Sequence, residues 1–280
     1  MRRLLTIGVL LAVSFLLSTT VLVFAANTFW DVPENAWYAE SVESLAEKNI
    51  LQGNPDGSFH PNDPVSRAEM AVLLDRTLEY LEDGEVDIDK PMTSAYLDVP
   101  FSSQAPTGTW VLPYAEACEE TSIIMVKAFL AGETLDKETA TNEIVALTSY
   151  VESEGMGVDI GAEQVAQVAE DFYRLKATVY FDDEVTVENI KALLNVGHPV
   201  IIPASGHSLA NPNYTDDGPP YHMIVIVGYN EEGLITHDPG TQFGASYVYS
   251  FETIDKAIHD WAGSKSNVEE GRRAMVVLTN

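Results

Sequence analysis

The chain has 280 residues, 46% of them hydrophobic, and a formal net charge of -28 from 15 basic and 43 acidic side chains. This length predicts one to three domains, and the composition is sufficient for a packed core. The excess of acidic residues argues against a nucleic-acid partner, because phosphate backbones are bound by clustered Lys and Arg. Cys118 is the only cysteine, so no disulfide within one chain is expected.

The N-terminal segment predicts export from the cell. Arg2 and Arg3 precede an apolar run over residues 4–24, and Val23 and Ala25 have the spacing of a signal-peptidase site. We therefore expect residues 1–25 to be a cleaved secretory signal, and the exported protein to lie at the cell wall, on the cell surface or in the medium. The alternative is an uncleaved anchor, because the run is long enough to span a bilayer.

Residues 27–81 have the pattern of a small helix-loop-helix unit. Asn35 is expected to cap the first helix, and turn-forming residues fill positions 53–57. Ser66 and Glu69 have the spacing of a capping box, in which each side chain bonds the other residue's backbone amide. The apolar residues behind this box recur at helical spacing and predict a second helix: Met70, Leu73, Leu74, Leu78 and Leu81.

This unit resembles the S-layer homology module almost from end to end. The resemblance is carried by Phe29-Trp30-Asp31-Val32, Trp37, Asn49-Ile50-Leu51-Gln52-Gly53, Asp56-Gly57-Ser58-Phe59, Pro61 and Ser66-Arg67-Ala68-Glu69. It implies that the module binds a secondary polysaccharide of the cell wall, with Arg67 contacting the anionic polymer. The alternative is that Arg67 pairs with an acidic residue of its own helix. The family usually carries three modules in tandem, so the single copy here implies that strong binding requires oligomerisation.

The rest of the chain predicts a linker and one larger domain. Residues 82–94 are acidic, contain proline and have no sustained apolar period, which is typical of a linker. Residues 95–280 begin with helical patterns and continue mostly with strand patterns. Helices followed by an antiparallel sheet predict an α+β fold.

Cys118 has the placement of a nucleophile. It follows a loop at residues 113–117 and begins a stretch that is apolar on almost every side, as in a buried central helix. A helix N-terminus stabilises a thiolate, so we expect a lowered pKa for this thiol, although Glu119 and Glu120 act in the opposite direction. The alternative is a small buried hydrophobic residue, which is the usual role of a free cysteine.

His222 and Asp238 are candidates for a general base and the group that orients it. His222 precedes a fully apolar strand, residues 223–227, and the turn at residues 230–233 predicts a hairpin that brings Asp238 beside it. Gln104, fourteen residues before Cys118, has a side-chain amide that can donate to a developing oxyanion. The alternatives are a surface histidine at a strand start and, for Asp238-Pro239-Gly240, a simple turn.

The order of these four residues resembles papain-like cysteine peptidases, most closely the branch related to bacteriocin leader peptidases. The resemblance is carried by residues 99–104, 117–122, 221–229 and 237–240 and spans nearly the whole domain. It implies a papain-like fold and a thiol hydrolase of peptide or amide bonds, with Cys118 as nucleophile, His222 as base, Asp238 as orienting group and Gln104 as oxyanion donor. Leader peptidases usually have Cys-Gly where this chain has Cys118-Glu119, so specificity for double glycines is not carried over.

The sequence also bears on cofactor binding, metal binding and two other functions. No cofactor is predicted, because the sequence has no phosphate loop or dinucleotide fingerprint. A metal site at His222, His237 and Asp238 is the weaker alternative, since the chain has one cysteine and no closely spaced histidines. A non-catalytic binding domain on the same fold and a peptidoglycan amidase or endopeptidase both remain open. The expected partners are wall polysaccharide and a peptide or protein substrate.

Overall fold

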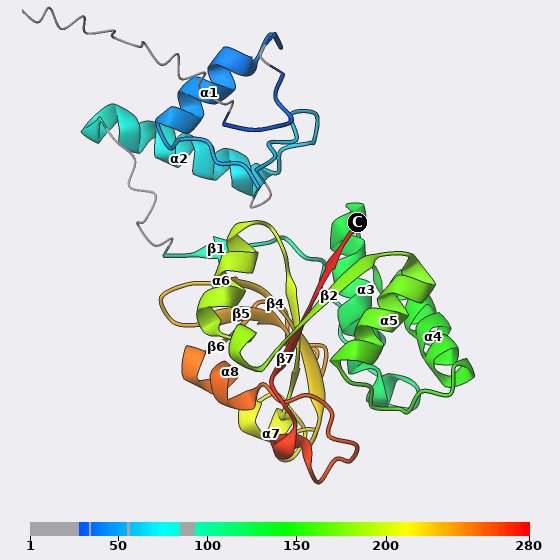
Figure 1. The fold of residues 1–280 in the computed structure, drawn as a ribbon. Helices are drawn as coiled ribbons and strands as arrows, with labels where there is room; N and C mark the ends of the chain where they lie inside the picture. The colour runs from blue at the N-terminus through cyan, green and yellow to red at the C-terminus, as the bar shows by residue number, and fades with distance from the viewer. Residues whose placement is uncertain (1–27, 34, 55–56, 85–92) are drawn as a thin grey trace, which may run out of the picture. The chain divides into compact units, whose positions relative to one another are not determined.

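The computed structural model describes residues 28–33, 35–54, 57–84 and 93–280, with the side chains of residues 67, 68 and 83 left out. The chain divides into two compact units between residues 88 and 89 (Figure 1). The predicted signal, residues 1–25, and most of the predicted linker, residues 82–94, lie outside the described residues. Among the helices of the described part, none is long and apolar enough to cross a membrane.

The described part of the first unit has two helices around a small apolar core. Helix α1 spans Ala39–Glu47 and helix α2 spans Arg67–Asp83. Both pack with the segment that precedes them, and the buried core residues are Phe29, Val32, Ala39, Val42 and Leu51. The expectation that Asn35 caps the first helix is wrong, because two backbone turns over residues 33–39 come first.

Helix α2 begins with the predicted capping box. The Ser66 hydroxyl accepts a hydrogen bond from the Glu69 amide at 3.1 Å, and the Glu69 carboxylate accepts one from the Ser66 amide at 2.6 Å. Leu73 packs against the core of the unit. Four other apolar side chains of the helix are 44–73% exposed: Met70, Leu74, Leu78 and Leu81. The helical spacing therefore gives the predicted helix, but much of its apolar surface stays uncovered.

The second unit has the predicted α+β fold, with helices first and an antiparallel sheet after them (Figure 1). The first three helices are α3 (Cys118–Ala131), α4 (Lys137–Ser153) and α5 (Ala162–Tyr173). The sheet has the order β2-β7-β3-β4-β5-β6, with β1 paired to β4. Its strands are β1 (Ala95–Tyr96), β2 (Lys176–Phe181), β3 (Val200–Ala204), β4 (His222–Tyr229), β5 (Leu234–His237), β6 (Tyr247–Tyr249) and β7 (Ala274–Thr279). Shorter elements are α6 (Val187–Asn195), α7 (Gly206–Leu209), α8 (Phe251–Ala257), η1 (Tyr114–Glu116), η2 (Asp182–Glu184) and η3 (Val268–Glu270).

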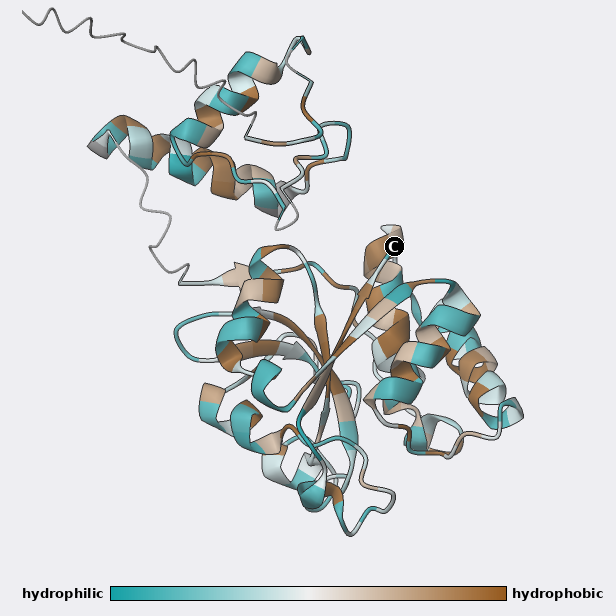
Figure 2. Cartoon of the chain, viewed as in Figure 1, coloured by the Kyte–Doolittle hydropathy of each residue, from teal (hydrophilic) through white to brown (hydrophobic). Residues whose placement is uncertain are grey.

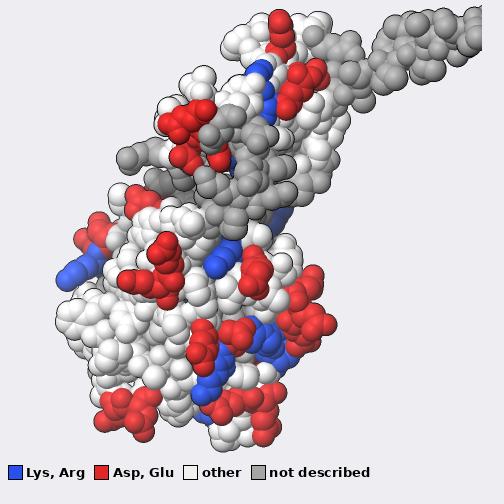
Figure 3. All heavy atoms as spheres, turned by 90° about the vertical axis from the view of Figure 1, so that its left-hand side faces the viewer, with Lys and Arg blue, Asp and Glu red and all other residues white. Residues whose placement is uncertain are grey.

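Helix α3 and strand β4 form the centre of the core. Residues 118–126 of α3 are all buried, and so is every residue of β4. Figure 2 shows the hydrophobic residues concentrated on α3 and the central strands, with hydrophilic residues on the outer helices. Figure 3 shows acidic side chains spread over one face of the molecule with basic ones between them, in keeping with the net charge of -28.

The strand register brings His222 and the end of the strand before Asp238 to the same end of the sheet. Ala204 of β3 lies opposite His222, the first residue of β4, and Val225 lies opposite His237, the last residue of β5. Gly228 sits at a bulge in β4, where a Cβ would lie 2.4 Å from the backbone oxygen of Ala95 in β1. Glycine therefore allows β1 to pair with β4 there. The β4–β5 hairpin returns the chain so that Asp238 stands beside His222.

Candidate active site

Cys118 begins helix α3, as predicted, but its thiol is held in an unexpected way. The residue is 6% exposed, and its Sγ donates a hydrogen bond to Glu119 Oε2 at 3.0 Å. Burial, the charge and hydrogen bond of Glu119, and the charge of Glu120 raise the pKa of the thiol well above its usual range. The expectation of a lowered pKa is therefore wrong for this arrangement, because burial and two carboxyl groups outweigh the helix terminus.

His222 and Asp238 form a buried pair. His222 Nε2 and Asp238 Oδ1 lie 2.7 Å apart, and the two residues are 1% and 0% exposed. Because Nε2 is engaged by the carboxylate, Nδ1 is the ring nitrogen left for proton exchange. Among the described residues, no hydrogen bond joins this ring to Cys118. Helix α3 and strand β4 nevertheless meet beside these residues. The Ser122 hydroxyl of α3 bonds the Cys118 oxygen within its own helix at 2.8 Å and the Met223 oxygen of β4 at 3.4 Å.

Three residues that the sequence analysis did not single out hold Asp238 in place. Asp238 Oδ2 accepts hydrogen bonds from the Tyr214 and Tyr249 hydroxyls, both at 2.6 Å, and from Asn211 Nδ2 at 3.1 Å. Burial acts to raise the pKa of Asp238, but the charge and hydrogen bond of His222 and the hydrogen bonds of the two tyrosines keep the pKa below its usual value. Tyr214 also meets the His222 ring edge-on, with 5.6 Å between ring centroids.

Gly240 shapes the turn after Asp238. Its amide donates to Asp238 Oδ1 at 2.9 Å. A Cβ at this position would lie 2.8 Å from His222 Cε1 and 2.9 Å from His222 Nε2. The Asp238-Pro239-Gly240 sequence thus makes a turn and also leaves room for the imidazole, so the two interpretations of this motif are compatible.

Gln104 lies between the segment that precedes Cys118 and the turn that follows Asp238. Its backbone amide donates to the Pro239 oxygen at 2.9 Å, and its side-chain Nε2 donates to the Tyr114 oxygen at 3.0 Å. One hydrogen of this amide group is therefore committed, and the second is left to donate to another acceptor. Within the described residues, Gln104 Oε1 is buried without a hydrogen-bond partner.

His237 has a structural role and is not placed as a metal ligand. Its Nε2 lies 2.7 Å from the Val99 oxygen, and its Nδ1 accepts from the Ser246 amide at 3.1 Å. Burial lowers its pKa, which suits a neutral ring. Both ring nitrogens are thus occupied, which argues against the metal alternative at His222, His237 and Asp238. In the described ranges, no three His, Cys, Asp or Glu side chains are grouped as a metal site.

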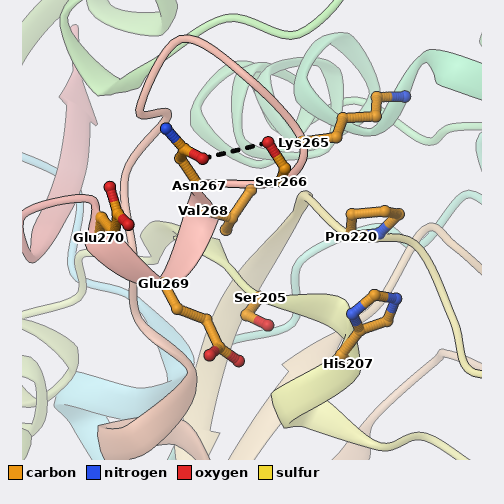
Figure 4. A pocket seen from close by; sticks show the side chains of 9 residues that line it. All are labelled: Ser205, His207, Pro220, Lys265, Ser266, Asn267, Val268, Glu269 and Glu270. Carbon is orange, nitrogen blue, oxygen red and sulfur yellow. Dashed lines mark hydrogen bonds between the residues drawn. The ribbon is translucent and has the colours of Figure 1, made fainter.

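A hollow of about 410 Å³ opens near the same end of the sheet (Figure 4). Its lining includes Ser205, which directly follows Ala204, and Pro220, two residues before His222. Lys265, also in the lining, pairs with Glu116 at 2.8 Å, two residues before Cys118. Figure 4 shows the Glu269 carboxylate turned toward Ser205, across the hollow from His207. The hollow is therefore a polar surface close to both candidate catalytic elements.

Comparisons with known proteins found curated relatives over part of the chain and one similar solved structure. The S-layer protein sap of Bacillus anthracis is 33% identical over 100 residues, which are 36% of this chain and 11% of that protein. The cellulosome-anchoring protein of Acetivibrio thermocellus is 27% identical over 105 residues, which are 38% of this chain and 20% of that protein. The chain thus spans only a small part of these curated relatives. A crystal structure described as a C39-like peptidase from Bacillus anthracis covers 67% of this chain and 98% of its own, with 18% identity and a TM-score of 0.45.

The family matches follow the two units. Residues 28–71 match the S-layer homology domain, and residues 96–268 match the Peptidase_C39 like family. Both resemblances found in the sequence are therefore confirmed. The larger match covers more than half of the chain, from β1 through α8, and ends before strand β7. The chain belongs to the Peptidase_C39 like family and carries an S-layer homology domain before its peptidase-like domain.

Proposed function

We propose that the protein is an exported thiol hydrolase of the cell surface, which cleaves peptide or amide bonds while its S-layer homology domain holds it to wall polysaccharide. The observation that carries this proposal is the buried His222–Asp238 pair, with 2.7 Å between Nε2 and Oδ1, at the strand that packs against the helix of the only cysteine. A base held by a carboxylate next to a potential nucleophile is the arrangement that covalent acyl transfer needs.

The proposed reaction follows from the roles of the four residues. His222 Nδ1 takes the proton of the Cys118 thiol, and the sulfur attacks the carbonyl carbon of the substrate. The imidazolium then gives its proton to the leaving amine, which leaves an acyl-enzyme. His222 next takes a proton from water, and the water oxygen attacks the thioester carbon. The C–S bond then breaks, the acid is released, and the imidazolium returns its proton to the Cys118 thiolate. Asp238 keeps the ring oriented, and the second amide hydrogen of Gln104 stabilises the oxyanion.

A non-catalytic binding domain is the second candidate, and one observation favours it. The Cys118 thiol donates a hydrogen bond to Glu119, and the residue is 6% exposed. In this arrangement the thiol is protonated and is not bonded to His222. A chain used only for binding would keep this contact in all conditions. The hydrolase requires that the thiol can turn to His222.

Hydrolysis measured on defined variants separates the two candidates. The exported chain is incubated with quenched fluorescent peptides and, separately, with purified peptidoglycan, and released amines are measured. Cys118→Ala and His222→Ala are expected to abolish hydrolysis. His198→Ala is the matched control, because His198 lies just before Val200, at the opposite end of β3 from the Ala204–His222 pair. Hydrolysis that survives Cys118→Ala, or its complete absence from the unaltered chain, would contradict the proposed function.

A further inference from the structure

Glu119 connects the candidate nucleophile to the helical half of its unit. Its Oε2 accepts the hydrogen bond from Cys118 Sγ at 3.0 Å, and its Oε1 accepts from the Ile160 amide at 3.2 Å, just before helix α5. The residue is 1% exposed. Both carboxylate oxygens are thus engaged inside the protein, and one of them holds the proton donor that the His222 base would need.

The groups around Glu119 are mostly acidic. Glu120, on the same turn, is 2% exposed, and its Oε2 has no hydrogen-bond partner among the described residues. Asp159 lies next to Ile160, and the Tyr221 hydroxyl, beside β4, donates to the Ile160 oxygen at 2.9 Å. Two cations offset part of this charge: Lys265 is engaged by Glu116 at 2.8 Å and by Asp159 at 3.6 Å, and Arg272 lies 3.8 Å from Asp260. Burial and the charges of Glu119 and Asp260 raise the pKa of the Tyr221 hydroxyl.

This environment disfavours negative charge on the two glutamates. Burial and the charge of Glu120 raise the pKa of Glu119 to about 8, against the opposing effect of the Cys118 hydrogen bond. Burial, together with the charge of Asp159, raises the pKa of Glu120 to about 7. Glu119 therefore changes its charge near neutral pH, while it touches the sulfur.

We propose that Glu119 is a positioning residue that gates the nucleophile: as a carboxylate it retains the Cys118 thiol, and as a neutral acid it releases the thiol to His222. The inference rests on the proposed function in one respect, the role of His222 as the base. It adds that the reactive state of Cys118 is formed only when Glu119 carries a proton.

The proton balance gives the direction of the pH dependence. With Glu119 neutral, the S–H bond of Cys118 breaks and an N–H bond forms on His222 Nδ1, so a thiolate and an imidazolium arise with no net change in bound protons. With Glu119 ionised, the same thiolate would stand beside a carboxylate, and two like charges in a buried site oppose its formation. The reactive pair is therefore present below the pKa of Glu119 and is lost as the pH rises through it.

Alkylation of the native protein by iodoacetamide tests this without any substrate, because Cys118 is the only cysteine. Mass spectrometry gives the rate of labelling between pH 6 and 9. In the unaltered chain the rate is expected to fall about tenfold from pH 7 to 9, the change in the neutral fraction of an acid with a pKa near 8. In Glu119→Gln, which keeps an acceptor for the Ile160 amide, the fall should vanish and labelling at pH 9 should be at least about tenfold faster. Glu120→Gln is the matched control: the fall should persist, because this carboxylate does not bond the sulfur, but it should move to lower pH, because the charge of Glu120 no longer raises the pKa of Glu119.

Several results would overturn the proposal. One is a rate in the unaltered chain that rises with pH as for a free thiol. Another is a fall that vanishes in Glu120→Gln as it does in Glu119→Gln. A third is that neither the unaltered chain nor Glu119→Gln is labelled. If circular dichroism shows that Glu119→Gln is unfolded, the profile of the unaltered chain decides alone. A Glu119-dependent profile in a chain that hydrolyses nothing would support the gate and contradict the hydrolase. Hydrolysis with no effect of Glu119 on labelling would contradict only the gate.

Discussion

Helices α2 and α3 are both expected from apolar residues in the sequence, and both form, but their surroundings differ greatly. The α2 sequence is apolar at helical spacing, whereas the α3 sequence is apolar on almost every side. Yet α3 is buried from residue 118 to 126, whereas Met70, Leu74, Leu78 and Leu81 of α2 are 44–73% exposed. The difference arises because α3 lies against strand β4, while the described residues of the first unit give α2 one short helix and a loop to pack against. Apolar spacing thus predicts a helix, but the partner element decides whether its surface is buried.

Acidic residues in the first turns of the same two helices also differ in burial. Glu69 of α2 is exposed and completes a capping box, which is the role its position predicts. Glu119 and Glu120 occupy the first turn of α3, where acidic residues also favour a helix N-terminus, but here they are buried beside a thiol. Buried carboxyl groups are costly unless they are paired or protonated. Buried acidic residues that break this rule are typical of functional or strained sites.

Among the changes that test this comparison, the largest effect is expected at Asp238, a buried residue of the second unit. Asp238→Ala removes the acceptor of His222, Tyr214 and Tyr249. It is expected to reduce turnover by at least about a hundredfold, because the ring loses its orientation. Each buried donor left without a partner also costs about 1–3 kcal/mol of unfolding free energy. Turnover is measured on the substrate found for the unaltered chain, and stability by urea unfolding.

The conservative variant Asp238→Asn is the control for this prediction. Its side-chain oxygen can still accept a hydrogen bond, so it is expected to fold normally and to lose only part of the turnover. If Asp238→Ala retained full turnover, the residue would serve only the turn with Pro239 and Gly240.

A matched pair of leucine substitutions measures the contrast in burial directly. Leu147 of α4 is 0% exposed, and Leu78 of α2 is 59% exposed. Leu147→Ala is expected to reduce the free energy of unfolding by about 2–5 kcal/mol, through lost burial and the cavity left behind. Leu78→Ala should change it by no more than about 0.5 kcal/mol. Urea unfolding of the full chain, followed by circular dichroism, gives both values. A cost above about 2 kcal/mol for Leu78→Ala would show that this side of α2 is covered in solution.

Much of the architecture could be predicted because its signals are local. The capping box of Ser66 and Glu69, the strand that begins at His222 and the hairpin that returns to Asp238 depend on residues close together in the chain. The start of α1 was missed, because the turns at residues 33–39 satisfy the backbone before Asn35 can act as a cap.

The surroundings of the candidate site were not predictable in the same way. Asn211 and Tyr214 come from a loop without apolar periodicity, and Tyr249 comes from the third strand after that loop, counted along the chain. Only the tertiary fold brings these three side chains to one carboxylate. The pKa of Cys118 was misjudged for a similar reason. The sequence shows that Glu119 and Glu120 are neighbours, but not that burial adds to their effect on the thiol.

The smallest effect is expected in the first unit, at Arg67, whose side chain lies outside the described residues. Arg67→Ala in the full chain should weaken sedimentation with purified cell wall about fivefold, because one exposed charged contact contributes on the order of 1 kcal/mol. Arg76→Ala is the matched control from the same helix, since Arg76 instead bonds Gln52 at 3.2 Å, and it should bind like the unaltered chain. A chain that stays in the supernatant even at high concentration would make the module a spacer. Binding that appears only when three copies are fused would instead show that attachment depends on oligomerisation, through the gain in effective concentration.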